Sequence, residues 1–395
     1  LVAGVSLVAP MFTLMIAFGD IFGLGGSSVI SRLLGEKKDN EAKKTCAFCI
    51  WVSLVFGLCI SAILLLFRTQ ILGLLGVSKV TYEYANAYYT WIAIGAVSII
   101  FSMVPSNILR TEGLAVQSMA GSIIGSIVNI IFDPIFIFGL NQGAAGAAMA
   151  TVLGNIIADI YYVYAVIKKS KRLTCSPSHM KITGRRVKDI LMIGIPASIT
   201  NIMQTFMMVM TNNFLLPYGT DKVAAMGIAL KVNMITALVL VGFAFGGQPL
   251  VGYNYGAGEY DRVKKITHTS MGLIALVMVM GMAISCAIPQ QLMGLFTTSR
   301  ATMEIGGAAL RIISFGFVVS SVSVTFSGVL EGLGKGMPSL LISLARYIVV
   351  MLPVSFALSR LLQASGVWYG FAVTEYIVAV LSYYIYKFHM RDIKG

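Results

Sequence analysis

The sequence predicts an all-α membrane protein made of two pseudo-symmetric helical lobes. Three observations support this fold class: apolar runs of twenty or more residues recur along the chain, period-2 alternation is absent, and the chain repeats itself at an offset of 221 residues. Each run is long enough to cross the ~30 Å hydrocarbon core of a bilayer, whereas a membrane β-barrel would need the alternation. A composition of 57% hydrophobic and 11% charged residues is not that of a soluble globular protein.

Eleven helices are predicted, separated by short polar or glycine-containing segments. They lie near residues 2–34, 42–67, 83–109, 116–139, 143–167, 187–217, 221–255, 260–289, 301–330, 336–361 and 365–388. The one long hydrophilic stretch, 168–186, contains Pro177 and many Ser, Lys and Arg residues, which is typical of a linker. It divides the chain into an N-terminal lobe, 1–167, with five helices and a C-terminal lobe, 187–395, with six.

The internal repeat is clearest where residues 25–44 align without a gap on residues 246–265. The double glycines Gly25-Gly26 and Gly246-Gly247 coincide there, and so do the closing lysine pairs. Further matches are Val2-Ala3 with Val223-Ala224 and, at an offset of 219, Glu112-Gly113-Leu114 with Glu331-Gly332-Leu333 and Pro134 with Pro353. Several matches in order at a nearly constant offset indicate a duplicated architecture.

The repeat is unequal at its front end. Leu1 corresponds to about Lys222 in the second helix of the C-terminal lobe, whereas that lobe begins near Thr183. Roughly forty residues, enough for one helix, have no counterpart, and the chain does not begin with Met. We therefore expect one more apolar helix, carrying an Asp, ahead of Leu1 in the complete protein, which would give six helices per lobe. A cleaved signal peptide is the alternative.

The net charge of +13 follows the predicted topology. Twenty Lys and Arg residues lie in one set of alternate connections and in the C-terminal tail, and five lie in the other set. Because cytoplasmic loops of membrane proteins are rich in Lys and Arg, the first set is predicted to be cytoplasmic, including the linker and the C-terminus. We expect a multi-pass protein of the cell membrane whose charge reflects orientation rather than nucleic-acid binding.

The sequence gives no sign of catalysis. Its five cysteines show no disulfide framework, and packing on one helix face explains the i, i+3 spacing of Cys46 and Cys49. No metal-ligand cluster, nucleophile motif or phosphate-binding glycine loop is found, and the three His residues fall in loop or terminal positions. An enzyme is therefore not predicted, and no cofactor is expected.

Two motifs carry a resemblance to a known family. The pattern Gly-Gly-x-Pro-Leu-Val-Gly-x-Asn-x-Gly occupies residues 246–256, and Asp133-Pro134-Ile-Phe-Ile-Phe-Gly-Leu is followed by Gly143-Ala-Ala-Gly-Ala-Ala-Met-Ala-Thr151. With its two lobes, the chain resembles the multidrug and toxic compound extrusion (MATE) transporters over its whole length, apart from their first helix. The resemblance implies an antiporter in which entry of H⁺ or Na⁺ drives export of small amphipathic, often cationic compounds through a cleft between the lobes.

The resemblance also implies a cation-coupling site at Asn129, Asp133 and Thr151, with H⁺ or Na⁺ held at Asp133. Counting from the helix ends places Asp133 and Thr151 at similar depth in adjacent antiparallel helices, with Asn129 one turn deeper. The family's acidic residue on the seventh helix has no counterpart here. On this basis Asp133→Asn is expected to abolish ion-driven export, and changes at Asp159 are expected to have weaker effects.

Other residues inside the predicted spans are candidates for lining the cleft or contacting substrate, because ionisable groups in a membrane are costly. They are Asp20, Asp159, Asn201, Gln204, Met207, Lys231, Arg346 and Glu375. The alternatives are side chains that reach water near a helix end for Asp20 and Asp159, and plain packing for Met207. Glu375 either neutralises a neighbouring cation in a buried network or lines the cleft. Basic residues lining the cleft would favour anionic or zwitterionic cargo.

The leading functional prediction is a cation-coupled multidrug exporter that works by alternating access, as a monomer in the lipid bilayer. Two alternatives stay open: a flippase of the wider superfamily for lipid-linked precursors, and an inactive transporter that lacks its first helix. A flippase would be expected to have extra helices and a strongly basic cleft, and only the second feature is hinted at here.

Overall fold

The computed structural model describes residues 2–77 and 81–391, and in those residues every regular element is a helix. The chain divides into two compact units, Leu1–Asn201 and Ile202–Gly395, called unit 1 and unit 2 below. The division falls inside one helix, α7 (Gly184–Leu215). The role of residues 168–186 as a linker between lobes stays a prediction.

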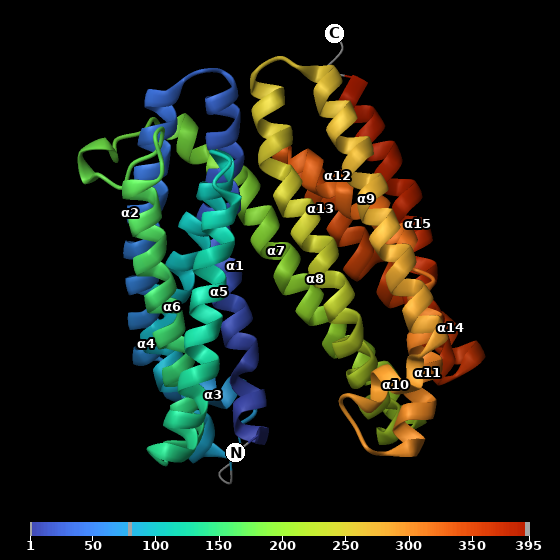
Figure 1. Ribbon diagram of the computed structural model, residues 1–395. Helices are drawn as coiled ribbons and strands as arrows, with labels where there is room; N and C mark the ends of the chain where they lie inside the picture. Colours follow the sequence, from blue (N-terminus) through green and yellow to red (C-terminus); the bar gives the residue numbers. More distant parts are fainter. Residues whose placement is uncertain (1, 78–80, 392–395) are drawn as a thin grey trace. The chain divides into compact units, whose positions relative to one another are not determined.

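Unit 1 is a bundle of long helices that run side by side (Figure 1). Its elements are α1 (Val2–Gly35), α2 (Asp39–Leu66), α3 (Arg68–Leu74), α4 (Tyr82–Thr111), α5 (Ala115–Pro134), η1 (Ile135–Gly139), α6 (Gly143–Lys168), η2 (Pro177–His179) and the first part of α7. Because α4 packs against α1, α2 and α6, it forms the centre of the bundle. Its residues Tyr89, Ile100 and Ile108 are fully buried.

Unit 2 repeats this plan with more interrupted helices. After the end of α7, its elements are η3 (Leu216–Tyr218), α8 (Thr220–Gly256), α9 (Tyr260–Ala287), α10 (Pro289–Gly294), α11 (Arg300–Ser314), α12 (Phe317–Gly332), α13 (Gly336–Leu344), η4 (Ala345–Val350), α14 (Met351–Leu362) and α15 (Ala364–Arg391). Here α12 packs against α8, α9 and α15, so it takes the central place that α4 has in unit 1.

The predicted membrane fold is confirmed. Among the described residues, ten helices are long and apolar enough to cross a membrane, and the pair α11 and α12 gives the eleventh span. The prediction of one continuous helix over 301–330 is wrong, because α11 and α12 are bent by 52° at a break between Ser314 and Phe317. The two residues at the break, Phe315 and Gly316, continue the apolar pattern, so hydrophobicity alone does not reveal the bend.

The outer helix α5 shows how the sequence separates a lipid-facing surface from a core. Only Ser118 and Gly121 are buried in it. Its large apolar side chains, among them Ile127 and Ile130, are exposed, as expected of a helix that faces lipid. At its end Pro134 has no amide to donate to the preceding turn, and the helix widens there into the π-helix η1.

The structure corrects part of the repeat. The turn after α4 has its left-handed residue at Gly113 (φ 82°), and the turn after α12 has it at Gly334 (φ 81°), so these positions are 221 residues apart. The closing bond from Leu114 N to Leu109 O likewise matches the bond from Lys335 N to Leu330 O. Glu331 is therefore equivalent to Arg110, and its match with Glu112 at an offset of 219 is wrong.

Candidate functional site

A line of polar side chains follows one face of α6 in unit 1. Thr151, Asn155 and Asp159 are four residues apart, and this spacing places them one above another on a helix. Each of the three makes a contact with a neighbouring helix, as described below. The line thus gathers polar groups from α4, α5 and α6 inside spans that are otherwise apolar.

The end of this line meets α5. Asn129 Nδ2 donates to Thr151 Oγ1 at 3.3 Å, and Thr151 donates to the carbonyl of Ala147 in its own helix at 3.0 Å. Such i−4 bonding satisfies the hydroxyl proton and leaves the oxygen available as an acceptor. The structure therefore brings together two of the three residues of the predicted coupling site.

The third residue of that site, Asp133, lies one turn further along α5 and is half-buried. It makes no hydrogen bond and no ion pair with any described residue. Asp133 therefore lies on the same face of α5 as Asn129, but its carboxylate forms no hydrogen bond with Asn129 or Thr151.

At the opposite end of the line lies Asp159, which is more enclosed than Asp133. Ser98 of α4 donates a short hydrogen bond to Asp159 Oδ2. The other oxygen, Oδ1, is buried and has no hydrogen-bond partner in the described part of the chain. Between the two ends, Ser102 Oγ approaches Asn155 Oδ1 at 3.5 Å, and Asn155 Nδ2 donates to the carbonyl of Thr151 at 2.8 Å. The carboxylate of Asp159 has no cationic side chain paired with it in the described residues.

A second buried carboxylate in unit 1 joins α1 to α7. Asp20 is 7% exposed, and its Oδ2 accepts a hydrogen bond from Asn201 Nδ2 at 3.1 Å. Both residues were predicted as cleft or substrate residues from the sequence, but their proximity was not. The first part of α7 packs closely on α1 here, because a Cβ on Gly194 would collide with the carbonyl of Ile21.

In unit 2 the predicted residues Arg346 and Glu375 form an ion pair. Arg346 Nη2 donates to Glu375 Oε2 at 3.1 Å and also makes a short hydrogen bond to Ser323 Oγ. Lys231 is exposed on α8 and forms no ion pair among the described residues. Gln204 is exposed, and the Met207 sulfur accepts from Thr211 Oγ1 at 3.5 Å.

Unit 2 also has an open groove of about 410 Å³ between α8 and α9. It is lined by Val239, Gly242, Phe243, Gly246, Gly247, Leu250 and Ser270. None of these lining residues is charged, and they include the double glycine of the repeat. Nothing in this lining identifies a polar ligand.

Sequence reasoning missed Ser98, Ser102 and Asn155. The asparagine had a usable signal, because it lies midway between Thr151 and Asp159 at helical spacing. The two serines had no such signal, because serines recur throughout the predicted spans and usually hydrogen-bond to the backbone of their own helix.

A helical membrane protein with duplicated units, interrupted helices and polar groups buried inside its spans has the architecture of a secondary transporter. The chain belongs to the MatE family, whose model matches residues 1–135 and 196–357. The resemblance to MATE transporters is thereby confirmed, and the protein is a membrane transporter rather than an enzyme.

Individual relatives agree with this assignment. The multidrug export protein MepA of Staphylococcus haemolyticus is 29% identical over 98% of this chain and 85% of its own length. An outward-facing multidrug resistance MATE family transporter of the MOP superfamily has a TM-score of 0.95 at 25% identity, over 100% of this chain and 88% of the other. A MOP superfamily transporter from Pyrococcus furiosus has a TM-score of 0.94, with the same identity and coverage.

Proposed function

We propose that the protein exports small amphipathic compounds by antiport, driven by the entry of H⁺ or Na⁺. The support is its membership of the MatE family together with its similarity to the multidrug export protein MepA. The proposed cargo is small and amphipathic, and no cofactor is needed for such a cycle.

The observation that carries the coupling is the carboxylate of Asp159. It lies inside a membrane span, accepts a hydrogen bond from Ser98 with one oxygen, and has its other oxygen buried without a hydrogen-bond partner among the described residues. A carboxylate in a medium of low polarity is costly to leave charged and unpaired, so it takes up a proton or a cation. Asp159 is therefore suited to bind and release the coupling ion.

The rest of the polar line supplies a path to this group. Asp133 is half-buried at the start of the line, and Asn129 and Thr151 offer neutral oxygens next to it. Neutral oxygens beside a carboxylate suit either a protonated water or Na⁺. We propose that the ion meets Asp133 first and reaches Asp159 through Asn155. The sequence predicts a larger effect on coupling for Asp133 than for Asp159. We propose the reverse order, because Asp159 is the more enclosed of the two carboxylates.

The test is efflux of the cationic dye ethidium from proteoliposomes under an imposed H⁺ or Na⁺ gradient. Asp159→Asn keeps the side-chain volume but cannot exchange a proton near neutral pH, so gradient-driven efflux should fall to the level of protein-free vesicles. Asp133→Asn should slow efflux and weaken its dependence on ion concentration. Asp261→Asn is the matched control and should behave as wild type, because the Asp261 side chain is 99% exposed.

Two results would decide against parts of this scheme. Full gradient-driven efflux by Asp159→Asn would place the coupling group elsewhere. If Asp133→Asn alone abolished coupling, the ion would be held at the outer site of Asn129, Asp133 and Thr151, as the family resemblance implies. Protein levels and thermal stability in each vesicle preparation exclude loss of folding as the cause.

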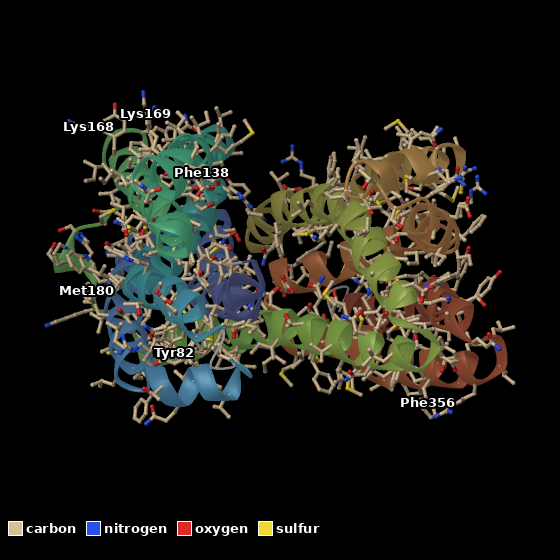
Figure 2. All side chains as sticks on the ribbon, turned by 90° about the horizontal axis from the view of Figure 1, so that it is seen from below. Tyr82, Phe138, Lys168, Lys169, Met180 and Phe356 are labelled. Carbon is tan, nitrogen blue, oxygen red and sulfur yellow. The ribbon has the colours of Figure 1, made fainter. Side chains whose placement is uncertain are left out.

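We further propose that residues 168–186 and the C-terminus lie in the cytoplasm, since the basic residues concentrate on that side. Lys168 and Lys169, at the end of α6, project away from unit 1 (Figure 2). A Ser176→Cys variant in a cysteine-free background should resist an impermeant maleimide in intact cells and react after lysis. Ready labelling in intact cells would reverse the proposed orientation.

The native thiol of this segment provides a chemical control. Burial raises the pKa of Cys175 to about 11, so at neutral pH nearly all of it is the unreactive thiol. In lysed cells Cys175 should therefore label slowly at pH 7, and its rate should rise about tenfold per pH unit below that pKa.

A further inference from the structure

The ion pair of Arg346 and Glu375 is enclosed by three elements of unit 2. Arg346 belongs to the π-helix η4, Glu375 to α15 and their shared neighbour Ser323 to α12. The two charged side chains are only 14% and 21% exposed, so they are mostly buried yet still reachable. The Nε of Arg346 is buried without a hydrogen-bond partner in the described residues. Its guanidinium therefore has a donor to spare.

Comparison of the two repeats shows that the fold does not require charged side chains beside this serine of the central helix. Ser323 and Ser102 are equivalent at the offset of 221, and each donates to the carbonyl three residues before it, Ser320 and Ile99. In unit 1 the partner of Ser102 is the neutral amide of Asn155. Since a buried ion pair generally stabilises a fold no better than neutral groups, the charges in unit 2 call for a functional reason.

Irregular backbone lies on both sides of the ion pair. The break between α11 and α12 lies beside Glu375, because a Cβ on Gly316 would be 3.3 Å from the Glu375 Cγ. On the other side, Arg346 lies in a π-helical turn, a widened geometry that frequently occurs at functional sites. Interrupted helices are also where secondary transporters form their binding sites.

The charge balance of the pair restricts what could bind there. A simple cation that takes Glu375 would leave Arg346 charged and unpaired, and a simple anion that takes Arg346 would leave Glu375 in the same condition. A zwitterion replaces both partners at once: its carboxylate or phosphate pairs with Arg346 and its ammonium group pairs with Glu375. The site then stays neutral, and no buried charge is left alone.

We propose that Arg346 and Glu375 form a binding site for amphipathic zwitterions that carry one anionic and one ammonium group. The ligand opens the ion pair and exchanges partners with it, and Arg346 Nε supplies an additional donor to the ligand's anionic group. This inference rests on the proposed export of small amphipathic compounds and names a substrate class for it.

The first experiment needs no variant. Nα-dansyl-L-lysine has a carboxylate, a free ammonium group and a fluorescent aromatic body; its methyl ester is a cation, and its Nε-acetyl derivative is an anion. Binding of all three probes to the protein in nanodiscs is measured by dansyl fluorescence. The zwitterion should bind at least about tenfold more tightly than either relative, because each loses a charge-assisted hydrogen bond. Equal affinities would overturn the proposal.

Variants then locate the preference. Arg346→Gln and Glu375→Gln should each remove the tenfold discrimination, whereas the double exchange Arg346→Glu with Glu375→Arg should retain part of it by restoring a pair. Arg311→Gln is the matched control: this arginine also lies in a span of unit 2, but it is exposed and bonds to the carbonyl of Cys286. A preference that survives in both single variants would place zwitterion binding elsewhere.

Transport of ethidium and of dansyl-lysine distinguishes failure of the zwitterion site from failure of the proposed export. Ethidium export by wild-type protein, without preferential binding of the zwitterion, would refute the zwitterion site and leave antiport intact. If the protein bound the zwitterion preferentially but exported neither ethidium nor dansyl-lysine, the proposed export would be refuted and the binding site would remain.

Discussion

Unit 1 and unit 2 have the same arrangement of helices but differ in how their buried polar groups are paired. In unit 1, Asp159 ends a line of neutral hydroxyls and amides, and no described cationic side chain pairs with it. In unit 2, the equivalent central helix contributes Ser323 to an ion pair between Arg346 and Glu375. The difference indicates that one fold accommodates two arrangements of buried polar groups, a carboxylate among neutral partners in unit 1 and a charge-neutral ion pair in unit 2.

A second pair of equivalent positions shows the same divergence. In unit 1, Arg110 Nε donates to Ser118 Oγ at 3.0 Å, and Ser118 also lies 3.2 Å from Ser106. In unit 2, Ser339 donates to Glu331 at 2.8 Å and lies 2.5 Å from Ser327. The serine pairs are conserved between the repeats while the charge beside them is inverted. A hydroxyl allows this because it both donates and accepts.

The largest expected effect tests whether the ion pair of unit 2 is needed for folding. Arg346→Gln leaves Glu375 mostly buried without its cation and should cost about 3–5 kcal/mol of stability. The stability of the double variant with Glu375→Gln should return close to that of wild type. Two neutral amides can hydrogen-bond to each other, much as the neutral side chains of Ser102 and Asn155 do in unit 1. Thermal unfolding in detergent, followed by tryptophan fluorescence, measures both.

The single variant Glu375→Gln completes the cycle and supplies the coupling energy between the two side chains. If the double variant were as unstable as Arg346→Gln, the charges would be structural. Unit 2, unlike unit 1, would then need charged groups at this position to fold.

Much of the fold was predictable, because long apolar runs and a repeat of fixed offset are strong signals in a membrane protein. The break at Phe315 and Gly316 was not, because a bend leaves the apolar character of a span unchanged. The register at residues 112–114 was misassigned because the identity of Glu112 and Glu331 was given more weight than turn geometry. The positive φ of Gly113 and Gly334 fixes that register, and it is visible only in the structure.

The candidate site was predictable to a lesser degree. Depth along adjacent helices matched Thr151 with Asp133 and placed Asn129 one turn deeper, whereas the structure bonds Thr151 to Asn129, at 3.3 Å. Depth does not reveal which side of a helix is enclosed, so Asp133 was ranked above Asp159 on family resemblance. In unit 2, the sequence offered several cations for Glu375, and only the packing of η4 against α15 selects Arg346.

The smaller expected effect concerns the double glycine that both units share. In unit 1, a Cβ on Gly25 would collide with the carbonyl of Ile190 and lie 3.1 Å from the amide nitrogen of Gly194. Backbone atoms cannot rotate away, so Gly25→Ala must separate α1 from α7 and should cost about 1–3 kcal/mol. In unit 2, Gly246 borders the open groove, and a Cβ there would meet nothing within 4 Å.

Gly246→Ala should therefore be neutral or stabilising by up to about 1 kcal/mol, because alanine favours the helix more than glycine does. The two variants change the same residue type at equivalent positions, so the difference between their unfolding temperatures isolates the contact with α7. That difference should disappear if the glycine pair serves only helix flexibility in both units. A loss of stability in Gly246→Ala as large as that in Gly25→Ala would mean that the groove on α8 is filled by close packing in the folded protein.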